Sequence, residues 1–292
     1  MRAGVIGLGA MGSGIAANLA RAGLLSTVWN RTHAKAASFA ADYEVEMAEG
    51  PAAVAAAADV VLISVSADND LLGVVDALAG NLAPGSVVVD TSTVAPDTAR
   101  EAAQRVRSSG AEFLDAPVSG GPEGARNGTM VMMVGGDEKV LERIQAVLDP
   151  ICSAAHYMGP VGAGQATKAV NQIMVAGIMQ GVATGLAYGR EQGLELDKVI
   201  EVLSGGAGSN WQLAQRGPNV ARDLFPPGFK LVLHHKDLAL VRASLAAQGV
   251  SLELIERTLA DYDRLIEQGY GDEDISALYR LRRQDLADNF GR

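Results

Sequence analysis

The chain has 292 residues, of which 48% are hydrophobic, 20% charged and only 4% aromatic. This composition is that of a globular protein with a sizeable core, and it excludes an intrinsically disordered chain and a coiled coil. The formal net charge of −10 disfavours binding to nucleic acids and to anionic membranes. The single cysteine, Cys152, cannot form a disulfide within the chain and is expected to be a small core residue.

The start of the chain lacks the form of a secretory signal, because residues 4–14 carry five glycines and no compact apolar segment. We also expect no membrane-spanning segment, since no apolar run reaches the length of about 20 residues that a bilayer requires. The chain is therefore expected to be cytoplasmic. Its length predicts two domains.

Short β-prone runs alternate with alanine-rich helical segments from residue 3 to about residue 159, which is typical of βαβ units on a parallel sheet. Most of the runs are continuously apolar, as expected for strands covered on both faces. The expected strands are 3–6, 26–30, 59–65, 86–91, 112–115, 129–134 and 155–158. The expected helices between them are 13–22, 33–41, 51–57, 69–82, 96–109 and 138–148.

A glycine motif, G-L-G-A-M-G, lies between the first expected strand and the first expected helix. In such a turn the first glycine allows a tight bend, the second lets the backbone approach a pyrophosphate, and the third lets helix and strand pack closely. Free N–H groups at the helix start add to the attraction for phosphate. An unliganded glycine-rich turn is the alternative, but the flanking elements favour dinucleotide binding. The candidate residues are Gly7, Leu8, Gly9, Ala10, Met11 and Gly12.

The end of the second expected strand bears on the choice of dinucleotide. NAD-binding units usually carry Asp or Glu here for the ribose hydroxyls, whereas this chain has Asn30, followed by Arg31 and Thr32. Arg31 could bind a 2′-phosphate with two parallel hydrogen bonds, and the missing carboxylate removes a repulsion. The sequence therefore favours NADP over NAD, the alternative being an exposed loop arginine without a ligand.

The strand pattern stops at residues 159–164, and the rest of the chain is helical in pattern. We predict an α/β Rossmann domain with a mostly parallel, doubly wound sheet over residues 1–161, followed by an all-α domain over residues 162–292. The first helix of the second domain is expected over 165–192. Its small or apolar positions predict close helix packing, and they are Ala169, Ile173, Gly177, Gly181 and Gly185.

Two further motifs complete the pattern: D-A-P-V-S-G-G at residues 115–121 and G-Q-A-T-K-A-V-N-Q at residues 164–172. With the glycine motif, D-T-S-T at 90–93 and K-D-L at 236–238, the chain resembles the β-hydroxyacid dehydrogenases over nearly its whole length. This family includes 3-hydroxyisobutyrate dehydrogenase, tartronate semialdehyde reductase and the glyoxylate and succinic semialdehyde reductases. The resemblance implies hydride transfer between a nicotinamide and a short 3-hydroxy acid or its semialdehyde. It also implies a cleft between two domains and a homodimer or homotetramer.

The resemblance also assigns roles to individual residues. Lys168 matches the family's general acid/base, which exchanges a proton with the substrate oxygen. Asn171, on the same face of the helix, is expected to bind the substrate hydroxyl or hold the lysine, and Gln172 is an adjacent candidate. The substrate carboxylate is expected at Ser119, Gly120 and Gly121.

The remaining assignments concern the cofactor and the substrate side. Thr93 and Lys236 match cofactor-contacting residues of the family. Val65 and Ser66 occupy a cofactor-contacting position where family members often carry Leu-Pro. Trp211 and Phe229 should line the substrate side, with core packing as the alternative reading.

Two other readings of the fold stay open: an imine reductase, against which Lys168 argues, and a catalytically silent nucleotide-binding protein. The four histidines, 33, 156, 234 and 235, lack metal-ligand spacing, so no metal is expected. Arg280, Arg282 and Arg283 are interpreted as a solvated helix face, and residues 253–263 as an amphipathic helix.

Overall fold

The computed structural model describes residues 1–289, and the chain divides into two compact units. We call Met1–Lys168 the sheet unit and Ala169–Arg292 the helical unit. The predicted order, an α/β part followed by a helical part, is confirmed. The expected domain boundary after residue 161 stays a prediction.

The sheet unit is built on one nine-stranded sheet within the described residues, in the order β3-β2-β1-β4-β5-β6-β8-β7, with β9 paired to β8. Strands β1 to β6 pair in parallel, and β8 runs antiparallel to β6 and β7. The predicted mostly parallel, doubly wound sheet is therefore confirmed. The strands are β1 (Ala3–Ile6), β2 (Leu25–Trp29), β3 (Glu46–Met47), β4 (Val60–Ile63), β5 (Val87–Asp90), β6 (Glu112–Asp115), β7 (Val118–Ser119), β8 (Met130–Gly135) and β9 (Cys152–Gly159).

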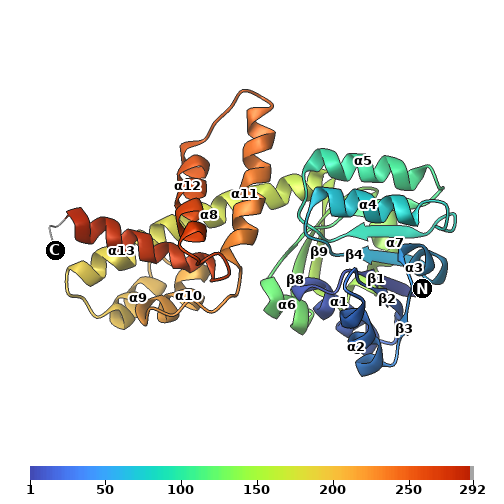
Figure 1. Ribbon diagram of the computed structural model, residues 1–292, viewed down its shortest axis with the longest axis horizontal. Coiled ribbons are helices and arrows are strands. Elements are labelled where there is room, and N and C mark those ends of the chain that lie inside the picture. The colour runs from blue at the N-terminus through green and yellow to red at the C-terminus, as the bar shows by residue number, and fades with distance from the viewer. Residues whose placement is uncertain (290–292) are drawn as a thin grey trace. The chain divides into compact units, whose positions relative to one another are not determined.

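Helices cover both faces of this sheet (Figure 1). Alternate residues of β4 show why: Val60 and Leu62 pack into one hydrophobic cluster, and Val61 and Ile63 pack into another. Helices of the first face are α1 (Ala10–Arg21), α2 (His33–Tyr43), α6 (Gly121–Asn127) and α7 (Glu138–Leu148). Those of the second face are α3 (Pro51–Ala57), α4 (Asp68–Leu78) and α5 (Pro96–Arg107).

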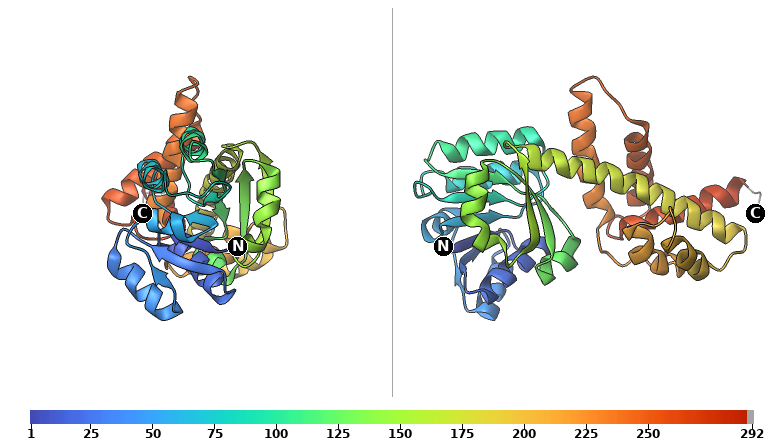
Figure 2. Two further views of the ribbon diagram at one scale, coloured as in Figure 1. Left: turned by 90° about the vertical axis from the view of Figure 1, so that its right-hand side faces the viewer. Right: turned by 180° about the vertical axis from the view of Figure 1, so that it is seen from behind.

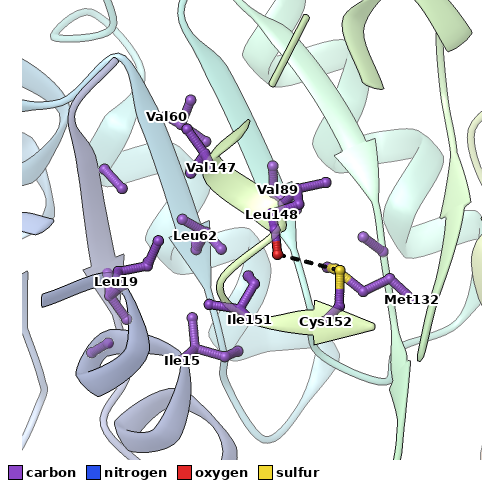
Figure 3. Packing of buried hydrophobic residues seen from close by; sticks show 14 of the residues in the cluster. Ile15, Leu19, Val60, Leu62, Val89, Met132, Val147, Leu148, Ile151 and Cys152 are labelled. Carbon is purple, nitrogen blue, oxygen red and sulfur yellow. Dashed lines mark hydrogen bonds between the residues drawn. The ribbon is translucent and has the colours of Figure 1, made fainter. Parts of the chain in front are cut away.

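Cys152 lies in the first of these clusters, as Figure 3 shows, and the expectation of a core cysteine is confirmed. Its thiol donates a hydrogen bond to the carbonyl of Leu148, with 3.3 Å between sulfur and oxygen. Burial, with a smaller contribution from the Asp149 carboxylate, raises the pKa of this thiol to about 11. The thiol therefore stays protonated and is a poor nucleophile.

Three short elements were not predicted. Strands β3 and β7 have two residues each, too few for a β pattern to emerge. Helix α6 contains two glycines and a proline, residues that favour turns in an isolated sequence. Strand β9 begins three residues earlier than expected, and most of its residues are exposed or half-buried, so it lacks the apolar run of the central strands.

The helical unit has its own core, formed by buried residues of α8 to α13. Helices α11 and α12 lie side by side in Figures 1 and 2. Residues 253–263 are helical as predicted, and their helix continues to Glu267. The helices are α8 (Ala163–Glu191), α9 (Leu196–Ser204), α10 (Trp211–Ala221), α11 (Leu231–Ala246), α12 (Glu253–Glu267) and α13 (Leu278–Asn289), with a 3-10 turn at Ile275–Ala277.

Helix α8 begins in the sheet unit and continues into the helical unit, close to its predicted extent. It corrects one expectation, because by length and composition this helix could cross a membrane, with a mean hydropathy of 1.2 over 18 residues. A third of that window is buried in the chain. Core helices of soluble proteins pass the same test, so the match is weak evidence for a membrane span.

A second correction concerns Arg282, which was expected on a solvated face. Its side chain is only 8% exposed and forms an ion pair with Asp261, itself 2% exposed. Arg282 also donates hydrogen bonds to Asp285 and to the side-chain oxygen of Gln180. The expectation failed because partners 21 and 102 residues away in sequence leave no local pattern.

Candidate active site

The order of the sheet places a topological switch point at the carboxyl ends of two neighbouring strands. Strands β1 and β4 pair in parallel, while the helices that follow them, α1 and α4, cover opposite faces of the sheet. Ligands of doubly wound sheets bind at such a point, beyond the carboxyl ends of the strands. The glycine motif follows β1 and residues 64–66 follow β4, so both predicted cofactor segments lie at this switch point.

The three motif glycines have different surroundings. Gly7 has a φ of +94°, and a β-carbon there would collide with the carbonyl of Ser64. A β-carbon on Gly12 would collide with the carbonyl of Gly7, which explains the close packing of α1 on this turn. A β-carbon on Gly9 would meet no atom within 4 Å among the described residues. Sterically, then, Gly9 is not needed by the fold, and its open side is the space that a pyrophosphate would fill.

The start of α1 suits an anion. Gly9 is its N-cap residue, no side chain in residues 1–289 caps it, and the first turn carries no acidic residue. Gly9 and Ala10 are exposed and Met11 is half-buried. Backbone N–H groups at a helix start that lack an internal partner are the donors that bind phosphate oxygens. These residues therefore fit the pyrophosphate of a dinucleotide.

Asn30 ties the glycine motif to the end of β2. Its side-chain oxygen accepts a hydrogen bond from the Leu8 N–H at 2.9 Å, and its amide nitrogen donates to the Thr32 carbonyl at 3.0 Å. The side chain of Arg31 is 80% exposed and forms a 2.8 Å ion pair with Asp70. Asn30 thus has a structural task that the sequence did not reveal, while Arg31 is open to solvent.

The ends of β4 and β5 are joined by side-chain hydrogen bonds. The Val65 N–H donates to the Ser92 hydroxyl at 2.9 Å, and the Thr91 hydroxyl donates to the Ile63 carbonyl at 2.8 Å. Ser66 is exposed and Thr93 is half-buried beside these contacts. The structure therefore brings the predicted cofactor residues of the two strands to one edge of the sheet.

A buried carboxylate holds the start of α8. The two oxygens of Asp115, at the end of β6, accept hydrogen bonds from the N–H groups of Gly162 (2.8 Å) and Gln165 (2.9 Å). Burial raises the pKa of the Asp115 carboxyl, while these hydrogen bonds oppose the shift. The Gln165 amide donates to the Ser92 carbonyl and accepts from the Val94 N–H. Asp115 and Gln165 together fasten α8 to the ends of β5 and β6.

Lys168 follows one turn later on α8 and is only 8% exposed. Its Nζ donates a hydrogen bond to the Val118 carbonyl at 2.8 Å, directly before the predicted carboxylate-binding residues. Ser119 lies in β7, and Gly120 and Gly121 follow with positive φ values of 124° and 61°. The structure thus places the predicted acid/base residue next to the predicted anchor.

In the helical unit, Asn171 and Gln172 belong to a chain of hydrogen bonds. Gln172 is buried, and its Nε2 donates to Asp237 at 2.6 Å while its Oε1 accepts from the Asn171 Nδ2 at 2.8 Å. Lys236 pairs with the other Asp237 oxygen at 3.1 Å. Because an ionised carboxylate only accepts, Asp237 fixes the Gln172 amide, which in turn fixes Asn171 with its Oδ1 left to accept.

His234 supports the same segment from α11. Its Nε2 lies 3.2 Å from the backbone carbonyl of Gln172, and its Nδ1 lies 2.9 Å from the Tyr262 hydroxyl. Since a carbonyl can only accept, Nε2 must carry the proton. Burial, aided by nearby carboxylates, raises the pKa of Tyr262, so its hydroxyl stays protonated.

The two aromatic residues expected on the substrate side differ in their surroundings. Trp211 is 55% exposed at the start of α10, so core packing does not account for it. Phe229 is half-buried and packs against the His234 ring with 5.4 Å between ring centroids.

Sequence reasoning missed the residues that hold the site in place. Asp115 and Asp237 each lie within a motif that was recognised, yet neither was given a role. Gln165 also lies within a recognised motif, as the second residue of the 164–172 motif, and it too was given no role. For His234, no local signal exists, because its partners are 28 and 62 residues away in sequence.

The chain matches two protein-family models and several proteins of known name. Residues 2–159 match the family model of the NAD-binding domain of 6-phosphogluconate dehydrogenase, and residues 162–282 match the NAD-binding domain of NADP-dependent 3-hydroxyisobutyrate dehydrogenase. The chain is 34% identical to the NAD-dependent L-serine dehydrogenase of Pseudomonas aeruginosa, over 94% of this chain and 96% of that one. It is 35% identical to the 2-hydroxy-3-oxopropionate reductase of Escherichia coli, over 95% and 96%.

Solved structures with the same fold include members of the same family. The structure of Mycobacterium tuberculosis 3-hydroxyisobutyrate dehydrogenase with L-serine superimposes with a TM-score of 0.89 and 31% identity, covering 97% of this chain and all of that one. An imine reductase from Myxococcus stipitatus shares the fold alone, at 21% identity and a TM-score of 0.65.

Proposed function

Because the chain belongs to the β-hydroxyacid dehydrogenase family, we propose that it transfers hydride between NADP and a short 3-hydroxy acid or its semialdehyde, with Lys168 as the general acid/base. The observation that carries the proposal is the position of Lys168. Lys168 is 8% exposed and donates a hydrogen bond to the Val118 carbonyl, so it is not a solvated surface lysine. Its partner Val118 directly precedes residues 119–121. Substrates of the 3-hydroxyisobutyrate, glyoxylate and succinic semialdehyde type fit this proposal.

The reaction sets the tasks of the residues. Oxidation removes a hydride from the carbinol carbon and a proton from its oxygen, and reduction returns both. When bound, the nicotinamide supplies or takes the hydride. Lys168 Nζ gives the proton to the carbonyl oxygen in reduction and takes it back in oxidation, and its charge stabilises the developing alkoxide.

The other residues orient the substrate. The Ser119 hydroxyl and the N–H groups of Gly120 and Gly121 hold the carboxylate, because these residues lie between the end of β7 and the start of α6, where Gly120 is exposed. Asn171 uses its Oδ1 to accept from the substrate hydroxyl or the lysine ammonium. Either hydrogen bond is compatible with the amide orientation that Gln172 and Asp237 impose on Asn171.

The test compares Lys168→Ala with Lys198→Ala, which removes an exposed lysine of the helical unit. We expect kcat for a semialdehyde such as succinic semialdehyde to fall about 10²- to 10⁴-fold in the first variant. The Kd for NADPH should stay within a few-fold, and the second variant should keep full activity. Unchanged turnover in Lys168→Ala would contradict the acid/base role. A complete absence of turnover in the unaltered protein, across a substrate panel with both cofactors, would favour a silent nucleotide-binding protein.

For the cofactor, the Gly9 space and the uncapped start of α1 support a bound dinucleotide, and the 80% exposed Arg31 supports a 2′-phosphate contact. Its partner Asp70 carries a charge that repels the same phosphate. We expect Arg31→Ala to weaken NADPH much more than NADH. Asp70→Asn should strengthen NADPH relative to NADH. Equal changes for the two nucleotides, measured by fluorescence titration, would show that Arg31 does not read the phosphate.

Further site residues and the assembly are also proposed from the sequence motifs. Thr93, Val65, Ser66 and Lys236 are proposed as further cofactor contacts, and Trp211 and Phe229 as substrate-side residues. A homodimer or homotetramer is proposed for the assembly, which light scattering of the purified protein would test.

A further inference from the structure

Helix α6 follows the proposed carboxylate-binding residues and is poorly suited to form on its own. It has seven residues, two of which are glycine, and no side chain among the described residues caps its start. Helices this short are unstable in isolation, and glycine lowers the helix propensity further. Packing against another part of the chain must therefore hold α6 in place.

The partner of α6 is α1, which lies beside it (Figure 1). The two helices meet at the backbone, because a β-carbon on Gly14 would lie only 2.6 Å from the carbonyl carbon of Ala125. One turn further along α1, the Nδ2 of Asn18 donates a hydrogen bond to the Ala125 carbonyl at 2.7 Å. That carbonyl belongs to the last turn of α6, where carbonyls lack a partner within the helix. Asn18 thus supplies the hydrogen bond that this end of α6 needs.

The amide of Asn18 is held in one orientation. Its Oδ1 accepts a hydrogen bond from Arg21 Nη1 at 2.7 Å, so its nitrogen faces the Ala125 carbonyl, which can only accept. A carboxylate at this position could keep the contact with Arg21 but could not donate to Ala125. The contact between the two helices therefore requires an amide.

The position of α6 sets the backbone of the proposed carboxylate-binding residues. The Gly120 carbonyl accepts the first hydrogen bond of this helix, from the Gly124 N–H at 2.9 Å. Gly120 and Gly121 have φ values of 124° and 61°, in a region that glycine enters freely and leaves as freely. The directions of their N–H groups consequently depend on where α6 is held.

We infer that Asn18 is a positioning residue for the substrate carboxylate, because it holds α6 and thereby aims the N–H groups of residues 120 and 121. It takes no part in hydride or proton transfer. Since α1 also begins at the glycine turn proposed for the pyrophosphate, one helix places both the cofactor and the carboxylate of the substrate. This inference rests on the proposed function.

A pair of aldehydes separates this role from a general effect on the fold. Succinic semialdehyde carries the carboxylate, butanal has the same chain length without it, and each is reduced by NADPH and a proton to the alcohol. Asn18→Asp keeps the size of the side chain and its contact with Arg21 but removes the donor to Ala125. We expect KM for succinic semialdehyde to rise about tenfold, with kcat, the kcat/KM for butanal and the Kd for NADPH all within about twofold.

The matched control is Arg21→Ala, which removes the exposed partner of Asn18 and leaves the hydrogen bond to Ala125 in place. It should leave the kinetics of both aldehydes unchanged. Gly14→Ala, which inserts a methyl group between the two helices, should reproduce the selective rise in KM. Equal losses for the two aldehydes in Asn18→Asp, or an unchanged KM for succinic semialdehyde, would overturn the inference.

Binding of an unreactive carboxylate gives a second measurement that needs no turnover. Isobutyrate lacks the hydroxyl, and its Kd is measured by saturation-transfer NMR. An inactive protein in which Asn18→Asp weakens isobutyrate about tenfold would contradict the proposed function alone. Equal Kd values for the unaltered protein and the variant would contradict the inference.

Discussion

The two units differ in how they form a site. In the sheet unit the proposed cofactor segments are mostly backbone: a glycine turn, a helix start and strand ends, all close to the motifs that encode them. In the helical unit the comparable features are buried side chains that meet across the sequence. His234, Asp237, Asp261, Asp274 and Arg282 are all less than 9% exposed, and each has a polar partner.

The two kinds of site place different requirements on the fold. A backbone site needs space and a tight turn, and a glycine provides both. A site made of buried charges needs every charge to be compensated, because an unpaired charge in the interior is strongly unfavourable. The glycine turn of the sheet unit should therefore be sensitive to added atoms, and the buried ion pairs of the helical unit to removed charges.

The largest effect is expected when one charge of the helical unit loses its partner. Asp261→Ala leaves the buried Arg282 with the neutral oxygen of Gln180 and the partly exposed Asp285, its one remaining ion-pair partner among the described residues. We expect a loss of about 3 kcal/mol in the free energy of unfolding, measured by urea titration with circular dichroism. Asp263→Ala, on the same helix, breaks only the exposed pair with His235 and should cost less than about 1 kcal/mol. Similar losses in the two variants would show that burial of the ion pair does not set its contribution to stability.

An intermediate effect is expected when an atom is added to the glycine turn. Gly12→Ala places a methyl group against the Gly7 carbonyl and should destabilise the sheet unit by about 1–3 kcal/mol. Gly9→Ala meets open space, so stability should change by less than about 1 kcal/mol, whereas NADPH should bind at least about tenfold more weakly. A Gly9→Ala variant with unchanged NADPH affinity would show that the pyrophosphate lies elsewhere.

The smallest effect concerns a charge created in the apolar core of the sheet unit. The pKa of Cys152 is about 11 when folded and about 9.0 when unfolded. Between these values the unfolded chain loses its thiol proton first, so stability should fall as pH rises from 9 to 11. At pH 10 the loss attributable to the thiol is about 1 kcal/mol. Comparison with Cys152→Ala isolates this contribution from the tyrosines, and an identical pH dependence of both proteins would refute it.

Much of the proposed cofactor half of the site could be inferred from the sequence because its signals are local. Residues 7–12 carry the turn and the helix start directly after the flanking strand, and Lys168 was proposed through a nine-residue motif. Local sequence patterns do not indicate a contact whose partners are distant along the chain. Arg282 was placed on a solvated face although its partner Asp261 buries it, and α6 was missed because glycine and proline lower its helix propensity.

The sequence by itself determined most of the strands and helices with their order, the glycine turn and the family, because apolar periodicity and short motifs act over neighbouring residues. Only the tertiary structure decided that Asp115 caps α8, that Asp237 orients Asn171 through Gln172, and that Arg282 pairs with Asp261. Those contacts join residues that chain folding brings together from dozens of positions apart. Hydrogen bonds and charge pairing depend on distances in space, which spacing along the chain does not specify.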